Sequence, residues 1–280
     1  MTYNPRTLKD KIVLISGGSQ GIGKELGCQL LKHGSKVVLT GRNQSKINSL
    51  KSELKSYKDN VLILKADVTS REDNLMVINE TIAFFGRLDV LINNAAVSAQ
   101  GYLSDTNDNV IHQLIDTNIK GVLFLTKYAI PELIKSHGSI LFISSIASFY
   151  GLPNYSLYSM TKSSLTALSE SLRLELKQHN VFVGICYLGF TENEPTKETF
   201  DSDGKLILVP KRNKFLTASR VQSVKKILRQ LKKKRKRKIT SWLGIILLIA
   251  SKFPTLITLF FSDANNSNPN RQAYNKPDER

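Results

Sequence analysis

The sequence predicts an α/β fold: a single domain built on a doubly wound, mostly parallel sheet. Short apolar, β-branched runs alternate with helix-length segments along residues 11–188. Such alternation is typical of βαβ units, with helices on both faces of a parallel sheet. A glycine-rich segment joins the first apolar run to the first helical pattern. With 280 residues, the chain is long enough for one large domain of this kind and short for two.

The first apolar run, 11–16, leads directly into the glycine-rich segment. Glycines let the backbone approach a pyrophosphate, and the free N–H groups at the start of the following helix bind it. An ordinary glycine-rich turn accounts for two glycines here, but not for the three at positions 17, 21 and 23 between a strand and a helix. We therefore expect a dinucleotide-binding loop made of Gly17, Ser19, Gln20, Gly21, Ile22 and Gly23.

The second predicted strand, 36–40, is followed by Arg42. A site for NAD needs an acidic residue near this point to bind the ribose 2′-hydroxyl. None occurs between Glu25 and Glu53. The guanidinium of Arg42 suits a 2′-phosphate instead. Arg42 as an ordinary surface charge is the alternative, but the missing acid argues against it, so we expect NADP(H) as the cofactor.

Further strands are predicted at 61–65, 89–92, 139–145 and 181–188. In sheets of this kind, ligands bind at the carboxyl ends of the strands. Residues at or just after the ends of these strands are Asp67, Val68, Asn94, Ala95, Ser145, Gly189 and Thr191. The convergence of Gly17, Arg42, Asp67, Asn94 and Ser145 on one edge is stronger evidence for a nucleotide site than any single motif.

Tyr158 and Lys162 are four residues apart, so a helix places them on one face, one turn apart. The ordinary pKa of a tyrosine is about 10, and a neighbouring ammonium lowers it. Ser145 can hold a carbonyl or alcohol oxygen nearby for proton transfer. Most such pairs lie on solvated helix surfaces, so this interpretation depends on the rest of the sheet edge. Asn118 lies inside the helix predicted at 107–135, where asparagine is unfavourable unless its amide has a functional role. The alternative is a polar side chain that caps a kink in the helix or faces solvent.

Together these motifs resemble those of single-domain short-chain dehydrogenases/reductases over roughly residues 9–240. The resemblance implies a Rossmann fold and a role for each matching residue. Tyr158 is implied as the acid/base and Lys162 as the group that lowers its pKa and holds the nicotinamide ribose. Ser145 is implied to orient the substrate oxygen, and Asn118 to support a proton-relay water.

The resemblance also implies that Asn94 helps to hold the cofactor and the central strands. The sequence departs from the family pattern in three ways. The usual Asn-Asn-Ala-Gly motif ends in Ala96, and Leu188-Gly189 replaces the usual Pro-Gly. Thr191 takes only approximately the place of the threonine that often binds the nicotinamide carboxamide. We therefore expect a loop of different shape over the nicotinamide, but unchanged proton-transfer groups.

The net charge of +17 belongs to one part of the chain. Residues 1–204 hold 21 basic and 20 acidic residues, whereas 205–262 hold 16 basic residues and no acid. This asymmetry favours a local anionic partner, such as a membrane face, over general binding of nucleic acid. We also expect no metal ion as a ligand.

The two cysteines, Cys28 and Cys186, lie in apolar settings, which excludes a disulfide framework and indicates a reducing compartment. The N-terminus lacks the apolar core of a signal peptide, so we do not expect secretion.

The basic run 232–238 precedes the apolar segment 242–261, which has the length of a membrane span. Lys252 and Pro254 interrupt this segment, and a lysine at mid-bilayer costs about 2.5–3.5 kcal/mol. Two short helices in the membrane interface, beside a basic run that attracts anionic lipid, are therefore favoured. A true span, a dimer contact or a wall of the substrate pocket remain open for the segment. For the run itself, a solvated helix end, or less favoured a nuclear-localisation or nucleic-acid-binding signal, remains open.

We expect the reductase domain to occupy 1–241, with 189–216 as a long loop that serves as a substrate lid. A helix at about 217–234 and a last strand near 236–241 would account for much of the basic run. The segment 262–280 is polar, and we expect it to be disordered.

The sequence thus predicts an NADPH-dependent oxidoreductase that reduces the carbonyl group of a lipophilic substrate, with Tyr158 as the proton donor. A long-chain keto lipid such as a 3-keto sphingoid base, a fatty carbonyl compound or a steroid is expected, because a membrane-docked enzyme draws its substrate from lipid. We expect a homo-oligomer, a dimer or tetramer, attached through 232–261 to the cytoplasmic side of a membrane. The alternative is a sensor or scaffold that binds NADP(H) without turnover and acts through the basic C-terminal module.

Overall fold

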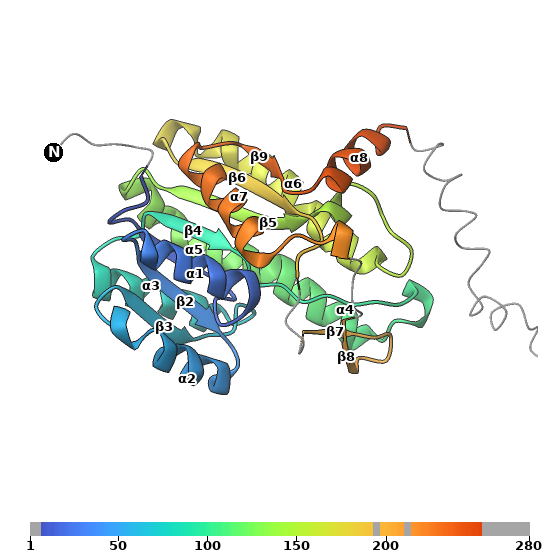
Figure 1. Ribbon diagram of the computed structural model, residues 1–280, viewed down its shortest axis with the longest axis horizontal. Coiled ribbons are helices and arrows are strands. Elements are labelled where there is room, and N and C mark those ends of the chain that lie inside the picture. The colour runs from blue at the N-terminus through green and yellow to red at the C-terminus, as the bar shows by residue number, and fades with distance from the viewer. Residues whose placement is uncertain (1–6, 193–196, 210–213, 254–280) are drawn as a thin grey trace, which may run out of the picture.

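The computed structural model describes residues 7–192, 197–209 and 214–253. A seven-stranded sheet runs through its centre in the order β3-β2-β1-β4-β5-β6-β9 (Figure 1). Every neighbouring pair in this sheet is parallel, so the doubly wound α/β fold expected from the sequence is confirmed. The strands are β1 (Ile12–Ile15), β2 (Lys36–Gly41), β3 (Val61–Lys65), β4 (Val90–Asn93), β5 (Ser139–Ser145), β6 (Phe182–Leu188) and β9 (Arg237–Ile239).

Helices cover both faces of the sheet, because the central strands are apolar on both sides. Val13 and Ile15 of β1 belong to one buried cluster, and Ile12 and Leu14 belong to another. Each fully buried side chain of this kind contributes about 1.5–3 kcal/mol. The first cluster includes side chains of α1 (Gly21–Lys32), α2 (Gln44–Glu53) and α7 (Arg220–Lys232). The second includes side chains of α3 (Arg71–Phe85), α5 (Gly121–Lys135) and α6 (Ser156–Glu175).

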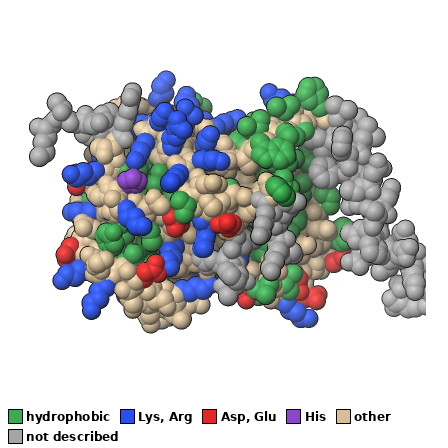
Figure 2. Space-filling model, viewed as in Figure 1, with side chains coloured by type: hydrophobic (Ala, Val, Ile, Leu, Met, Phe, Trp, Pro, Cys, Tyr) green, Lys and Arg blue, Asp and Glu red, His purple; other side chains and the backbone are tan. Residues whose placement is uncertain are grey.

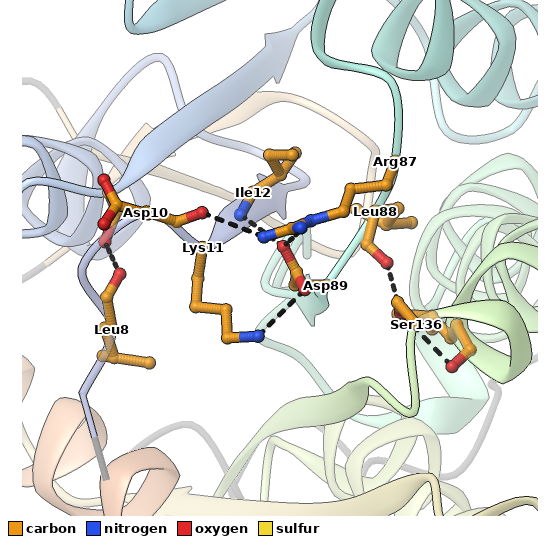
Figure 3. Close-up of polar contacts among 10 residues, drawn as sticks. Leu8, Asp10, Lys11, Ile12, Arg87, Leu88, Asp89 and Ser136 are labelled. Carbon is orange, nitrogen blue, oxygen red and sulfur yellow. Dashed lines mark hydrogen bonds and ion pairs between the residues drawn. The ribbon is translucent and has the colours of Figure 1, made fainter. Parts of the chain in front are cut away.

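Asp89 ties the amino ends of the two central strands together (Figure 3). Its buried carboxylate accepts hydrogen bonds from Lys11 Nζ at 3.1 Å, from the Ile12 N–H at 2.9 Å and from Arg87 Nε at 3.0 Å. Asp89 itself is 4% exposed, and these three donors compensate its buried charge. A cavity of about 580 Å³ also lies at this edge. Asp89 and this cavity lie at the amino ends of the strands, whereas the predicted nucleotide site lies at their carboxyl ends. We therefore interpret Asp89 as structural.

The helix expected over 107–135 is interrupted. α4 (Asp108–Ile115) is followed by a π-helical turn, Asp116–Lys120, before α5 begins. A π-turn inserts an extra residue into a helix and is frequently found at functional sites. Asn118 lies in this turn and is fully buried, so its amide does not face solvent.

The loop expected over 189–216 contains a two-stranded antiparallel ladder, β7 (Glu198–Phe200) with β8 (Leu206–Leu208). Its strands are too short for their alternation to stand out in the sequence. Long-range contacts hold the ladder: the Phe200 N–H donates to Ser98 O, and Ser98 Oγ donates to Thr199 Oγ1, both at 2.9 Å. The described part of the connection after β6 therefore includes a hairpin that packs against the segment that follows β4.

The C-terminal part of the described chain ends in α8 (Trp242–Ala250). The basic run divides between the end of α7, an exposed turn at 233–236 and β9, as the helix-and-strand interpretation expects. None of the helices within 7–192, 197–209 and 214–253 is long and apolar enough to cross a bilayer. The second apolar helix expected after Pro254 and the tail 262–280 lie outside the described residues.

Candidate active site

The glycine loop after β1 has the shape of a phosphate cradle. Gly17 has a φ of +64° and lies so close to Ala95 that a Cβ would come within 2.8 Å of its Cα. A Cβ on Gly23 would lie 2.2 Å from Gly17 O and 2.6 Å from Asn94 Nδ2. Gly21 has a φ of +58°, and a Cβ there would meet no atom of the described residues within 4 Å. Two glycines thus close the turn, and Gly21 leaves open space at the start of α1.

Asn94 fixes this loop to the end of β4. Its Nδ2 donates to Ser16 O and to Gly17 O, both at 3.0 Å. The buried Ser16 Oγ accepts from the N–H groups of Asn94 and Ala95 at 3.1 Å. Ser16 was not predicted as a site residue, because a serine at a strand end carries no signal of its own.

The other predicted loop residues surround the start of α1. Ser19 lies against Gly41, where a Cβ would meet its Oγ at 2.5 Å. Gln20 is the residue before the first turn of α1, and its side chain accepts from Lys46 Nζ. Ile22 packs against the buried cluster beneath the loop. The first turn of α1 has no acidic residue, so its N–H groups keep their attraction for an anion.

Arg42 and Asp67 meet at the carboxyl ends of β2 and β3, with Arg42 Nη1 3.7 Å from Asp67 Oδ2. Both side chains are at least one-third exposed, so this ion pair contributes about 0–1 kcal/mol and can open for a ligand. The pair borders a cavity of about 360 Å³ whose lining residues are Arg42, Lys65, Ala66, Asp67 and Asp73. Val68 follows this edge and packs against Gly121 at the start of α5.

Tyr158 and Lys162 lie on α6, with Lys162 Nζ 5.9 Å from the centre of the Tyr158 ring. Lys162 is 4% exposed, and its Nζ donates to Ile143 O on β5 at 3.1 Å. Ser144 Oγ donates in turn to Lys162 O at 2.9 Å. Burial, assisted by the positive charge of Lys197, lowers the pKa of Lys162 to about 8. The lysine is thus held under Tyr158 against the strand that ends at Ser145.

Ser145 caps the short turn that follows β5. Its Oγ accepts from the Ala147 N–H at 3.2 Å, which leaves the hydroxyl hydrogen available as a donor. Ser148 Oγ donates to Ser145 O at 2.6 Å, and Ser163 Oγ on α6 donates to Ser148 O at 2.9 Å. This chain of bonds holds the Ser145 turn against the helix that carries Tyr158.

Asn118 connects the π-turn to two neighbouring segments. Its side chain exchanges two hydrogen bonds of 2.9 Å with the backbone of Val97, the segment after β4. Its Nδ2 also donates to Thr161 Oγ1 at 3.1 Å, and Thr161 Oγ1 donates to Tyr158 O at 2.9 Å. Thr161, fully buried, is a site residue that was not predicted from the sequence. The predicted role of Asn118 toward a relay water stays a prediction.

Gly189 and Thr191 lie just after the end of β6, at the start of the segment 189–216 that was predicted to be a substrate lid. The Gly189 N–H donates to Thr240 Oγ1 at 2.9 Å. Thr191 is buried, and its Oγ1 lies 3.3 Å from Gly189 O and 3.1 Å from Ser223 Oγ on α7. The Thr191 hydroxyl therefore holds the loop to α7 in this structure, and its predicted contact with a cofactor remains a prediction.

The apolar surroundings of Tyr158 form one side of the site. Tyr158 and Phe200 of the β7–β8 hairpin pack against the same small buried cluster. The members of this cluster are Ala99, Val110, Leu114 and Leu157. The hairpin thus brings an aromatic side chain to the cluster that borders Tyr158.

This sheet, with its glycine loop and its tyrosine and lysine at one edge, is matched by the family model for short chain dehydrogenases over residues 11–204. The chain belongs to the short-chain dehydrogenase family. Among its relatives is an 11-beta-hydroxysteroid dehydrogenase B of Sesamum indicum, 34% identical over 202 residues, which are 71% of this chain and 56% of the relative. Dehydrogenase/reductase SDR family member 7B of Xenopus tropicalis is 29% identical over 265 residues, 91% of this chain and 84% of the relative.

Solved structures agree with the fold of this short-chain dehydrogenase. A short-chain dehydrogenase from Streptomyces avermitilis superposes with a TM-score of 0.76 at 22% identity, covering 92% of this chain and all of the other. ElxO, solved with NADP bound, superposes with a TM-score of 0.69 at 26% identity, covering 82% and 96%. The chain spans little more than half the length of the hydroxysteroid dehydrogenases that it matches.

Proposed function

We propose that this chain is an NADPH-dependent oxidoreductase that reduces the carbonyl group of a lipophilic substrate, with Tyr158 as the proton donor. The observation that carries the proposal is the buried Lys162, held by Ile143 O beneath the Tyr158 ring. Burying an ammonium is unfavourable, and groups with strongly shifted pKa values cluster at functional sites. With a pKa of about 8, Lys162 keeps its proton at pH 7 and can act on Tyr158 as a cation.

The residues at the sheet edge fit a dinucleotide. No atom of the described residues lies within 4 Å of a Cβ position at Gly21, and this space, together with the N–H groups at the start of α1, suits a pyrophosphate. Arg42 and Lys65 line the adjacent cavity and suit a 2′-phosphate, which favours NADPH over NADH. When bound, NADPH supplies the hydride, and the protein supplies position and electrostatics.

The proton-transfer groups act on the substrate oxygen. The Tyr158 hydroxyl donates its proton as negative charge develops there, and the free hydroxyl hydrogen of Ser145 donates a hydrogen bond to the same oxygen. The Lys162 ammonium stabilises the phenolate that remains on Tyr158. Asn118 and Thr161 hold the backbone of Tyr158, so its hydroxyl stays in place.

The proposed substrate is apolar around its carbonyl. The cluster beside Tyr158 and the ring of Phe200 offer no charge to a ligand, which suits a steroid, a fatty carbonyl compound or a long-chain keto lipid. The names of the plant relatives, hydroxysteroid dehydrogenases, support the first of these.

The test compares the parent with Tyr158→Phe on a panel of steroid, long-chain and small ketones, following NADPH oxidation. NADPH binding, measured by its fluorescence, is the control for intact structure. We expect unchanged binding and a loss of turnover of about 10²–10⁴-fold, the usual contribution of acid–base catalysis. Turnover by the variant within about tenfold of the parent would contradict the proton-donor role. A parent that binds NADPH but reduces no ketone would favour a sensor or scaffold.

A further inference from the structure

α8 is built onto the rim of the proposed active site. It follows β9 at the carboxyl edge of the sheet (Figure 1). Ser145 is the last residue of β5, which is parallel to β6 and β9, so it ends at the same edge. A Cβ on Gly244 would lie 2.4 Å from Ile146 Cγ2, next to Ser145. A Cβ on Gly189 would lie 2.3 Å from Ser241 Oγ, the cap of α8. Because both approaches are so close, the base of α8 is fixed relative to the site.

The rest of α8 is apolar and exposed. Its sequence is WLGIILLIA, without a polar side chain, and Gly244 alone among its residues is buried. Trp242, Ile245, Ile246 and Ile249 are each 50–58% exposed. Figure 2 shows hydrophobic side chains gathered over this helix. A helix that packs on a protein core presents polar residues on its outer face. α8 presents none, so its outer face is suited to an apolar medium.

The positive charges in the sequence around α8 indicate that its partner is anionic. Residues 205–262 contain no acidic residue, and Lys252 is exposed directly after α8. The exposed turn 233–236 adds four cations at the other end of β9. Anionic lipid attracts such cations while the interface accepts apolar side chains, and an apolar helix flanked by cations matches both.

We propose that α8 docks into the interface of an anionic lipid bilayer and so turns the rim of the active site toward the membrane. The docking stands on the exposed apolar face of α8 and on the cations at 233–236 and Lys252, and it does not depend on the proposed function. The purpose that we assign to docking is to let a lipophilic carbonyl compound enter the active site directly from lipid, and this purpose rests on the proposed function. An apolar substrate then reaches Tyr158 without crossing water.

Trp242 makes docking directly measurable, because it is the one tryptophan of the chain. We would titrate the full-length protein with vesicles of phosphatidylcholine mixed with phosphatidylglycerol and follow tryptophan emission and sedimentation. We expect a blue shift, quenching by lipids that carry a spin label in the acyl chain, and at least tenfold weaker binding to pure phosphatidylcholine. Unshifted emission, or equal binding to both vesicle types, would overturn the proposal.

Ile246→Glu and Ile249→Glu test the face itself, and both leave Trp242 in place. Because each side chain is at least half exposed, these substitutions spare the core. The matched control is Leu174→Glu, which adds the same charge at a leucine of α6 that is 76% exposed. We expect each α8 variant to bind the mixed vesicles at least tenfold more weakly, and the control to bind like the parent. Equal binding by the α8 variants would refute docking through this helix.

Two alternative partners for the apolar face of α8 can be detected by measurements without lipid. If a second copy covered α8, light scattering would show an oligomer that Ile246→Glu dissociates. If residues 254–280 covered it, their removal would shift the Trp242 emission to the red in buffer. Either result would overturn the proposal. None of these readouts needs turnover, so a protein that docks but reduces no carbonyl would contradict the proposed function and leave the docking intact.

Discussion

Lys162 on α6 donates from Nζ to the main-chain oxygen of Ile143 on β5, at 3.1 Å. The bond ties the helix that carries Tyr158 to the strand that ends at Ser145. Burial lowers the pKa of this lysine from 10.5 to about 8, so the folded protein holds its charge at a cost in stability.

Lys162→Met removes that cost. The difference between the two pKa values corresponds to about 3 kcal/mol, and the loss of the bond to Ile143 O offsets about 1 kcal/mol. We expect the cofactor-free variant to be about 2 kcal/mol more stable than the parent near pH 7, and inactive. Between pH 8 and 10.5 the unfolded lysine binds a proton that the folded one lacks, so parent stability rises with pH and the gap narrows. Urea unfolding at about pH 7 and about pH 10 checks this; a gap that widens with pH would contradict it.

Gly21 and Gly86 form a matched pair. Both have positive φ, +58° and +82°, and no atom of residues 7–192, 197–209 or 214–253 lies within 4 Å of a Cβ position at either. Alanine at either should cost about 1–2 kcal/mol of backbone strain, measurable by urea unfolding. Only Gly21→Ala should also weaken NADPH binding, by at least about tenfold, because only there does the methyl group enter the cradle. Equal NADPH affinity in the two variants would remove Gly21 from the cofactor site.

Arg42→Ala tests the choice of cofactor. A charge-assisted bond to a phosphate contributes about 1.5–3 kcal/mol, so NADPH affinity should fall by about 10–150-fold and NADH affinity should change little. Lys51→Ala, an exposed cation on α2, is the control for a lost positive charge. Fluorescence titration with each cofactor gives the result; parallel losses for NADPH and NADH would rule out a 2′-phosphate contact.

Thr161 is expected to act as a positioning residue. Thr161→Val removes the hydroxyl that joins Asn118 Nδ2 to Tyr158 O and leaves a buried donor unsatisfied, at about 1–3 kcal/mol. We expect kcat to fall while KM stays nearly constant, and Thr161→Ser to restore kcat. A purely structural role would lower stability without changing kcat of the folded enzyme.

Much of the fold followed from the sequence because its determinants are local. The apolar runs of β1 to β6 and the three glycines sit in contiguous segments, and Tyr158 and Lys162 share one helix turn. The strands that carry the glycine loop, Arg42, Asp67 and Ser145 are parallel members of one sheet, so these residues share its carboxyl edge.

The remaining features depend on contacts between distant segments. The π-turn around Asn118 differs from an α-helix by one inserted residue and is stabilised through Val97 and Thr161. The β7–β8 hairpin has three-residue strands held by Ser98, about 100 positions away in the chain. The role of the Ser16 hydroxyl appears only when β1 and β4 are adjacent.

The most direct test follows the hydride itself. Parent and Tyr158→Phe would be incubated with a ketone from the panel and with NADPH that carries deuterium at both C4 positions of the nicotinamide, and the alcohol would be analysed by mass spectrometry. The account predicts that the parent forms alcohol that carries one deuterium and that the variant forms at least about 10²-fold less. Unlabelled alcohol from the parent, or equal labelled product from both proteins, would contradict hydride transfer at Tyr158.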